Sequence, residues 1–257
     1  MQRLSESIKK IKSVLVSADV ITYEFSSAAG KKFALVYVDG LIDKAQLGEL
    51  VVKPLAGVKS GATAEDVRSI LASPEVKEDD DFSVAVKEIS YGSAALLIDG
   101  EKTFFIIGLT KPPGRAVAEP PTQIAVKGPR EGFTEDIKVN CALVRKRLKS
   151  PDLRLDTVRT GRRSDTAVTI CYLADVCDPA IPEKLKTQIE NTEIDIVADS
   201  SYVGRFVSSR PRSLFKRCAT CEKPDIFCAK ISEGRAGIIV DGSPIAITVP
   251  YMLVEDF

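Results

Sequence analysis

The sequence repeats itself, and this internal repeat constrains the fold more than any other feature. Lys87–Gly100 aligns without gaps to Ala229–Gly242, with identical Ile, Ser, Gly, Ala, Asp and Gly residues. Each half also opens with an apolar stripe at helical spacing, formed by Leu4, Ile8, Ile11 and Leu15 in the first half and by Ile137, Cys141, Val144 and Leu148 in the second. Such a repeat predicts two copies of one folding unit.

Local signals predict the helices and turns of each copy. Gly92 and Gly234 stand where a glycine ends a helix, and the Asp-Gly pairs at 99–100 and 241–242 predict type I′ hairpins. Thr134 is the expected N-cap of the helix that opens the second half. Further helices are expected at Lys44–Leu55, Ala64–Leu71, Phe82–Tyr91, Pro182–Glu190 and Asp225–Glu233.

Helices that alternate with short β-branched runs indicate an α/β protein. We therefore predict two similar α/β subdomains, in each of which helices cover a mixed sheet. The N-terminal subdomain is expected at residues 1–111 and the C-terminal one at residues 126–257. Residues 112–125 form the predicted proline-rich linker, which is stiff rather than flexible.

Composition excludes several classes of function. The chain has 36 basic and 36 acidic residues and no histidine. Without histidine there is no Ser-His-Asp or Cys-His catalysis and no imidazole metal ligand, and zero net charge gives no field that attracts nucleic acid. We expect no enzyme activity, no catalytic residues, no cofactor, no metal and no nucleic-acid partner. No apolar run reaches the roughly 18 residues of a membrane helix, and the N-terminus lacks a signal-peptide pattern, so a soluble, cytosolic chain is expected.

The six cysteines all lie in the second half. Cys218 and Cys221 form a CxxC pair, with Cys228 nearby. A redox CxxC needs a thiolate of lowered pKa, and structural zinc needs four ligands, of which only three are present here. Cys228 also aligns with Val86 of the first half, which favours ordinary buried thiols, although a redox or metal role stays open.

Two turns carry candidate ligand-binding or interface residues. A glycine-bounded turn, residues 128–133, precedes a helix N-terminus, where free N–H groups favour an anion; its candidates are Arg130 and Glu131. A basic turn between two strands supplies Arg162, Arg163 and Ser164. Guanidinium groups suit a carboxylate ligand. The alternatives are a tight connector with structural ion pairs for the first turn, and a solvated hairpin tip or salt-bridged subunit contact for the second.

Several segments together resemble one family. They are GPREGFTE (Gly128–Glu135), SPDLRLDTVRTGRRSDTAV (Ser150–Val168), IDIVADSSYV (Ile194–Val203), KPDIFCAKISEGRAGIIVDGSPIAITVP (Lys223–Pro250) and, in the first half, ALVYVDGLID (Ala34–Asp43). In this order they resemble the GerA family of bacterial spore germination proteins. The part matched is the soluble N-terminal domain of a nutrient germinant receptor A subunit.

The resemblance implies a sporulation protein of the spore inner membrane, with this domain facing the cytoplasm (the spore core) and membrane segments elsewhere in the full-length protein. It implies partnership with the B and C subunits and with other copies of the A subunit, as an ion channel subunit in nutrient sensing and signal transduction. Paralogues accompany the dipicolinate-release machinery, and the GRRS and GPREGF motifs favour the receptor branch.

Two hypotheses for the domain follow from this resemblance. In the first, it takes part in subunit assembly and in the signal coupling that triggers germination in response to nutrients. In the second, a small-molecule germinant, an amino acid or a sugar, binds directly between the two subdomains through the five candidate residues of the two turns.

Overall fold

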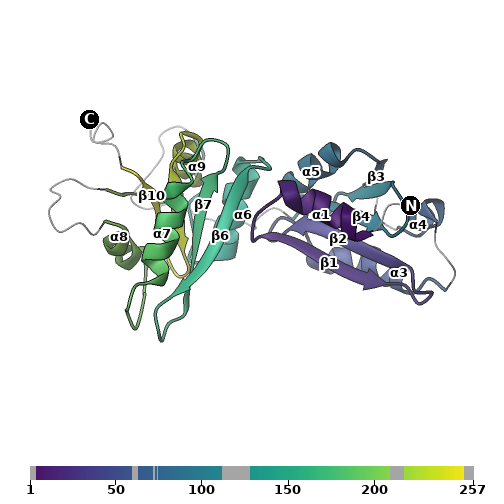
Figure 1. The fold of residues 1–257 in the computed structure, drawn as a ribbon, viewed down its shortest axis with the longest axis horizontal. Coiled ribbons are helices and arrows are strands. Elements are labelled where there is room, and N and C mark those ends of the chain that lie inside the picture. The colour runs from purple at the N-terminus through teal and green to yellow at the C-terminus, as the bar shows by residue number, and fades with distance from the viewer. Residues whose placement is uncertain are drawn as a thin grey trace. The chain divides into compact units, whose positions relative to one another are not determined.

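Each half of the chain builds a five-stranded sheet with helices on both faces (Figure 1). The computed structural model describes residues 4–59, 63–71, 73, 75–111, 128–208 and 217–251. The chain divides into a first unit, Met1–Pro112 with Lys149–Pro151, and a second unit, Pro113–Leu148 with Asp152–Phe257. The predicted linker, residues 112–125, lies outside the described residues.

The elements of the first unit follow one another in the order helix, hairpin, helices, strand, helix, hairpin. They are α1 (Leu4–Val14), β1 (Val20–Ser26), β2 (Lys32–Val38), α2 (Lys44–Leu47), the π-helical turn η1 (Gly48–Val52), α3 (Lys53–Ala56), α4 (Ala64–Ile70), β3 (Val76–Asp79), α5 (Phe82–Ser90), β4 (Ala94–Ile98) and β5 (Phe104–Ile107). The strand order in the sheet is β1-β2-β4-β5-β3.

The second unit repeats this order. Its elements are α6 (Ile137–Arg147), β6 (Leu153–Thr160), β7 (Thr166–Leu173), α7 (Ala180–Glu190), α8 (Ser200–Ser208), β8 (Ala219–Cys221), α9 (Pro224–Ser232), β9 (Ala236–Val240) and β10 (Ala246–Val249). The strand order is β6-β7-β9-β10-β8, which matches the first sheet position by position. The prediction of two similar α/β subdomains is confirmed.

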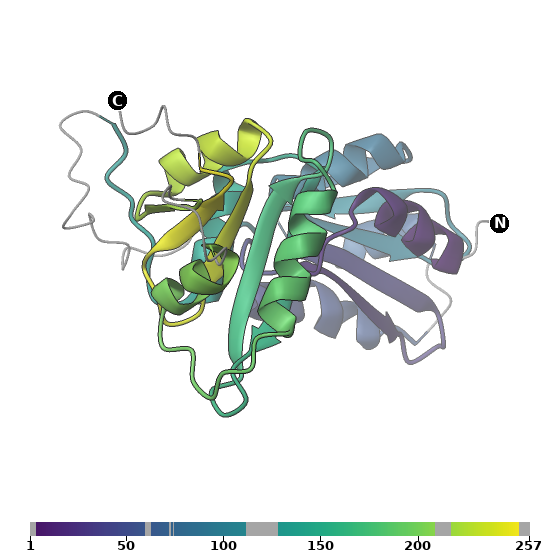
Figure 2. The ribbon, with the colours of Figure 1, turned by 60° about the vertical axis from the view of Figure 1, so that its left-hand side comes forward.

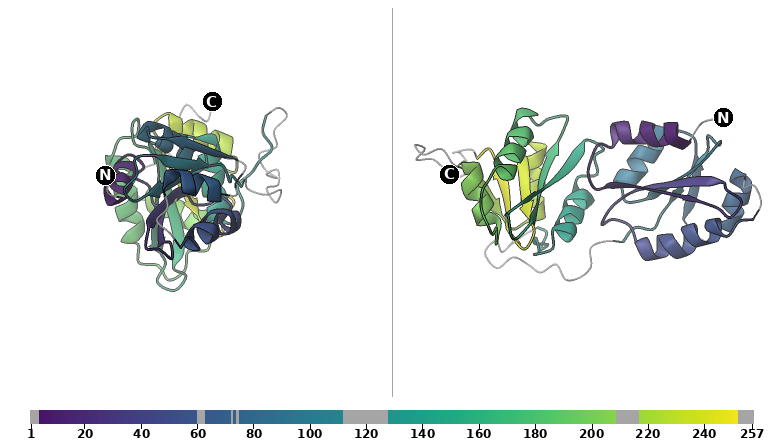
Figure 3. Two further views of the ribbon diagram at one scale, coloured as in Figure 1. Left: turned by 90° about the vertical axis from the view of Figure 1, so that its right-hand side faces the viewer. Right: turned by 60° about the horizontal axis from the view of Figure 1, so that its bottom comes forward.

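Each sheet buries both of its faces. In the first unit, Phe33 and Leu35 of β2 pack with the α2–α4 layer, while α1 and α5 contact β2 and β4 from the other side (Figure 3). In the second unit, α6 and α9 cover one face and α7 and α8 the other (Figure 2). Alternation along a strand sends neighbouring side chains to opposite faces, so two apolar faces need two helical layers.

In both units, an aspartate of the second hairpin binds the N-terminus of the first helix. The Leu4 N–H donates to Asp99 Oδ1 at 3.1 Å, and the Ile137 N–H donates to Asp241 Oδ1 at 3.4 Å. An aspartate at a helix N-terminus satisfies a free N–H group and complements the helix dipole. The aspartate of each Asp-Gly pair therefore ties the second hairpin of its unit to the first helix.

The sheets are antiparallel rather than mixed, which corrects the prediction. Every strand pair that the structure describes is antiparallel, including the pairs β2–β4 and β7–β9 that are not joined by a hairpin. Alternation of helices and strands predicts the α/β class, but it does not fix strand direction, because a connection that contains helices can return the chain in either sense.

The Asp-Gly pairs form turns of another type than predicted. Gly100 and Gly242 have φ of 83° and 81°, whereas Asp165 is the only non-glycine residue with positive φ among the described residues. A type I′ turn needs positive φ at both central residues, so neither pair forms one. Only the glycine of each pair has positive φ, and the aspartate side chain binds the helix N-terminus.

Helix ends are predicted better than helix starts. Gly92 and Gly234 have φ of 99° and 90° and follow α5 and α9, as expected for glycines that end helices. Thr134 is not the N-cap of α6, because Asp136 accepts from the N–H groups of Lys138 and Val139. The expected helices all form within a few residues of their predicted ends, and α8 was not predicted.

No helix in the described part of the chain has the length and apolar character needed to cross a membrane.

We expect Gly237→Ala to lower the free energy of unfolding by about 1–3 kcal/mol, because the side chain would overpack the core. A Cβ at Gly237 would overlap the ring of Phe227, which is fully buried. The aligned positions of the first unit hold Ala95 and Ala85, so the same alanine is tolerated where the facing side chain is small. Chemical denaturation measures the loss, and Ala95→Gly is the matched control. An unchanged midpoint for Gly237→Ala would contradict this packing.

Candidate functional site

The basic turn is the tip of the β6–β7 hairpin, as predicted, and its backbone is bound to a distant segment. The N–H of Arg162 donates to the Ile194 carbonyl and that of Arg163 to the Asp195 carbonyl, both at 2.8 Å. Ser164 Oγ accepts from the N–H of Val197 at 3.1 Å. These hydrogen bonds hold the tip against residues 194–197, which connect α7 to α8.

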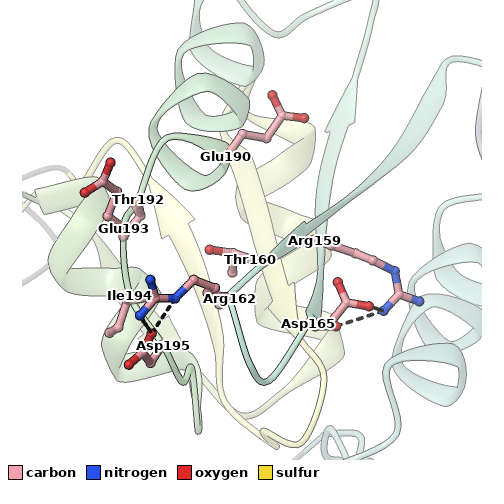
Figure 4. Close-up of a pocket in the computed structure, with 10 residues that line it drawn as sticks. Arg159, Thr160, Arg162, Asp165, Glu190, Thr192, Glu193, Ile194 and Asp195 are labelled. Carbon is pink, nitrogen blue, oxygen red and sulfur yellow. Dashed lines mark hydrogen bonds and ion pairs between the residues drawn. The ribbon is translucent and has the colours of Figure 1, made fainter.

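The arginines of the tip are paired with aspartates. Arg162 Nε donates to Asp195 Oδ1 at 2.8 Å, and Arg163 Nε lies 3.9 Å from the other oxygen of the same carboxylate. Arg159, on β6, donates to Asp165 at 2.8 Å. Figure 4 shows Arg159 and Arg162 reaching away from each other, each to its own aspartate. Arg159 and Arg162 each face an aspartate, whereas Arg163 shares the Asp195 carboxylate with Arg162.

A hollow of about 750 Å³ lies beside this tip (Figure 4). Its walls come from the end of β6, the turn, and the segment after α7; they include Arg159, Arg162, Glu190, Glu193 and Asp195. Its volume is within the range of small-molecule sites, but such sites are mostly apolar and carry few polar groups. This hollow is lined largely by charged residues, and its arginines already have partners.

The other candidate residues lie before α6. Glu131 accepts from Lys146 Nζ and from Arg147 Nη2, both at 2.8 Å. The hydrogen bond from Lys146 holds the pKa of Glu131 below its usual range, assisted by the charge of Arg147. Arg130 is exposed. The first turn is thus a connector whose glutamate bridges two cations at the end of α6.

The described contacts do not bring the two groups of candidates together. Glu131 is bound at the C-terminal end of α6, which leads into β6, whereas residues 162–164 follow the far end of that strand. Eight residues of β6 span about 26 Å at roughly 3.3 Å per residue. All five candidates belong to the second unit, so the predicted ligand site between subdomains stays a prediction.

Sequence reasoning missed Asp195, the residue that pairs with the hairpin arginines. It lies 33 positions after Arg162, and it has the character of an ordinary loop aspartate in the sequence. Its presence in the IDIVADSSYV segment was the available signal. Lys146, which binds Glu131, was likewise not selected from the sequence.

The three cysteines of the CxxC region are free thiols; Cys221 and Cys228 lie in the core, and Cys218 is partly buried. Cys221 and Cys228 are 2% and 5% exposed, and burial raises the pKa of each thiol to about 12. A reactive cysteine needs the opposite shift. Within the described residues, no group of three or more Cys, Asp or Glu side chains is placed to hold a metal ion. Val86, aligned with Cys228, is likewise buried, which supports a packing role for this cysteine.

Comparison with known proteins decides the family. The model of the Bacillus/Clostridium GerA spore germination protein family matches residues 6–257. This chain belongs to the GerA family. It is 27% identical over 262 residues to spore germination protein KA of Bacillus subtilis (strain 168), covering 100% of this chain and 48% of that protein. It is 31% identical over 260 residues to spore germination protein GerLA of Bacillus cereus, and the match covers 99% of this chain and 53% of that protein.

Other GerA-related proteins extend the comparison. Stage V sporulation protein AF of Bacillus subtilis is 31% identical over 230 residues, covering 87% of this chain and 46% of that protein. The chain thus spans about half the length of the curated relatives it matches. The crystal structure of the N-terminal domain of the A subunit of the Bacillus megaterium spore germinant receptor GerK3 shares the fold, with a TM-score of 0.74 and 24% identity; the match covers 98% of this chain and 96% of that one.

We expect Glu131→Gln to lower the free energy of unfolding of this GerA-family domain by about 1 kcal/mol at neutral pH, because a partly exposed bridging carboxylate is lost. The folded-state pKa of Glu131 is lowered, so its stabilisation is complete above the ordinary glutamate pKa of about 4.3. It disappears as the pH falls through the lowered value. Urea denaturation between pH 7 and pH 3 measures whether the free energies of unfolding of Glu131→Gln and of the unaltered chain become equal at low pH. Exposed Glu135→Gln is the control, and a deficit independent of pH would contradict the assignment.

We expect Ser164→Ala to destabilise the domain by about 1–2 kcal/mol, because the N–H of Val197 loses its acceptor. Arg162→Ala should cost under about 1 kcal/mol, because the Arg162 side chain is 78% exposed and its ion pair is solvated. Thermal and chemical unfolding of both variants test the order of these effects. A larger loss for Arg162→Ala would show that the ion pair, rather than the hydroxyl, holds the hairpin tip.

Proposed function

We propose that this chain is the cytoplasmic N-terminal domain of a spore germinant receptor A subunit. In this role it takes part in subunit assembly and in the signal coupling that triggers spore germination in response to nutrients. The full-length protein is embedded in the spore inner membrane, with this domain facing the spore core. The B and C subunits and other copies of the A subunit are its partners.

The observation that favours subunit assembly over ligand binding is that charged residues of the two turns are paired within the domain. Arg162 and Arg163 share the carboxylate of Asp195, and Glu131 binds Lys146 and Arg147. A carboxylate ligand would have to share each guanidinium with its internal carboxylate, whose negative charge opposes a second anion. Rigid, charge-compensated turns on a scaffold suit a surface that contacts other subunits, where rim charges contribute mainly to specificity.

Direct germinant binding is the second candidate function. The observation in its favour is the hollow of about 750 Å³ beside Arg162. In this version an amino acid or a sugar would use the polar groups of that hollow or of the predicted space between subdomains. Binding that favoured one arrangement of the domain would then bias the receptor toward its active state.

We expect no saturable rise in the thermal midpoint of this chain with millimolar amino acids, sugars or nucleosides, because the hollow beside Arg162 is lined largely by charged groups and Asp195 already shares the charge of Arg162 and Arg163. A ligand specific for the folded state would stabilise it by about 2.7 kcal/mol at a hundredfold excess over its Kd. In parallel, the full-length protein should co-purify with the B and C subunits, and deletion of this domain should abolish that association. A saturable shift for one nutrient, together with intact association after the deletion, would favour the second function.

A further inference from the structure

In the second unit, a short extended segment lies against the helices α6 and α9. We name Glu131–Glu135 the docked segment. The Phe133 ring packs edge-on against the Phe227 ring of α9, with centroids 5.3 Å apart, and the Phe133 N–H donates to the Glu222 carbonyl at 2.7 Å. Asn140 of α6, which is fully buried, hydrogen-bonds both the N–H and the carbonyl of Thr134. The segment therefore has an aromatic anchor and backbone hydrogen bonds.

The docked segment also has a charge anchor. Two residues before Phe133, the carboxylate of Glu131 bridges Lys146 and Arg147 at the end of α6. The charge of Arg147 acts on the thiol of Cys228 in α9, so this end of α6 faces α9. A glutamate two positions before a phenylalanine is thus held by cations and an aromatic ring on one pair of helices.

The first unit has the same pair of helices. The helix α1 has 11 residues like α6, and α5 has nine like α9. The internal alignment places Val14 at the position of Arg147 and Val86 at that of Cys228. Ser7 stands where Asn140 binds the docked segment, and it is 5% exposed.

A groove of about 600 Å³ lies on this pair of helices in the first unit. Its floor is apolar, formed by side chains that include Val14, Phe82, Val86 and Tyr91. Val14 is 44% exposed and Tyr91 is 43% exposed, so both present apolar surface in the groove. Partly exposed aromatic and aliphatic groups of this kind are typical of interaction surfaces.

Lysines surround this apolar floor. Lys10 Nζ lies 4.3 Å from the centroid of the Phe82 ring and Lys87 Nζ lies 5.8 Å from that of Tyr91. Lys149, from the segment that groups with this unit, lies 5.2 Å from the Tyr91 ring. Asp81 supplies the one carboxylate among the described residues that line the groove. It accepts hydrogen bonds from Ser83 at the N-terminus of α5. The groove thus carries an excess of positive charge over an apolar floor.

We propose that the α1–α5 groove is a docking site for an extended acidic–aromatic segment of a partner subunit. The segment carries a carboxylate two residues before an aromatic ring, as the docked segment does on α6 and α9. The lysines bind the carboxylate, and the ring packs among Phe82, Val86 and Tyr91. This inference rests on the proposed function, because it names the chemistry of one assembly contact.

A labelled synthetic peptide with the sequence of Gly128–Glu135 (GPREGFTE) is the probe, titrated against the full 257-residue chain by fluorescence anisotropy. We expect saturable binding that the double charge reversal Lys10→Glu with Lys87→Glu weakens at least tenfold. The matched control is Lys9→Glu with Lys12→Glu, which makes the same charge change at exposed positions of α1 outside the groove. Lys10→Gln with Lys87→Gln is the milder variant if the charge reversal prevents folding, as judged by circular dichroism.

Three results would overturn the docking site. They are the absence of saturable binding, equal weakening by the groove and control variants, and equal binding of a peptide that carries Gln and Ala in place of its Glu and Phe. Full competition by benzoate at the peptide's own affinity would also overturn it, because it would indicate a site for a small anion. Association of the unaltered full-length subunits is measured separately, so failure of the groove is distinguishable from failure of the assembly role.

Discussion

The burial of both faces of each sheet is the constraint on which the rest of the structure depends. All five residues of β4 and all five of β9 are buried. An antiparallel sheet can leave one face to water, but a strand that is apolar on both sides cannot. Each unit therefore needs helices before and between its strands. Charged side chains are left to the loops and to the outer faces of the helices, and the loops hold the residues that sequence reasoning selected as a site.

Charge pairing then decides what those loops can do. A guanidinium with a carboxylate at 2.8 Å, such as Arg162 with Asp195, offers a ligand little more than an exchange of partners. The pair is worth little to stability because it is exposed, yet it fixes the direction in which the side chain reaches. Such groups are better suited to define a surface than to capture a small anion. This distinction separates the two functions, because a sensor needs unfilled binding capacity, whereas a scaffold needs a defined shape.

The sequence predicted the features that depend on neighbours along the chain. The helical stripes, the glycines at 92 and 234 and the repeat itself are local patterns, and the structure confirms them. Strand direction could not be predicted, because it depends on how a connection folds back. The bond of Asp99 to the Leu4 N–H could not be predicted either, since these residues are 95 positions apart. The α6 N-cap was misplaced by two residues because Thr134, Glu135 and Asp136 offer competing caps.

The two units differ in how their helices fill the space above the sheet. In the second unit, the Phe227 ring both fills the space over Gly237 and packs against Phe133. In the first unit, alanines at 85 and 95 take the aligned positions, so no ring is available there. An aromatic side chain arriving on α1 and α5 would instead meet Phe82, one turn earlier on α5.

Phe82 already packs against Phe104 of β5, with centroids 5.5 Å apart. The Lys10 ammonium lies over the same ring. Charge and apolar surface are therefore adjacent in the first unit, whereas in the second unit Glu131 and Phe133 use separate partners. Because a lysine and an aromatic ring lie together in this groove, it favours a segment whose carboxylate and ring also lie close together. The first unit has Val14 and Ala85 in place of Arg147 and Phe227, so in the proposed docking site the lysines and Phe82 have to take over the roles of both anchors.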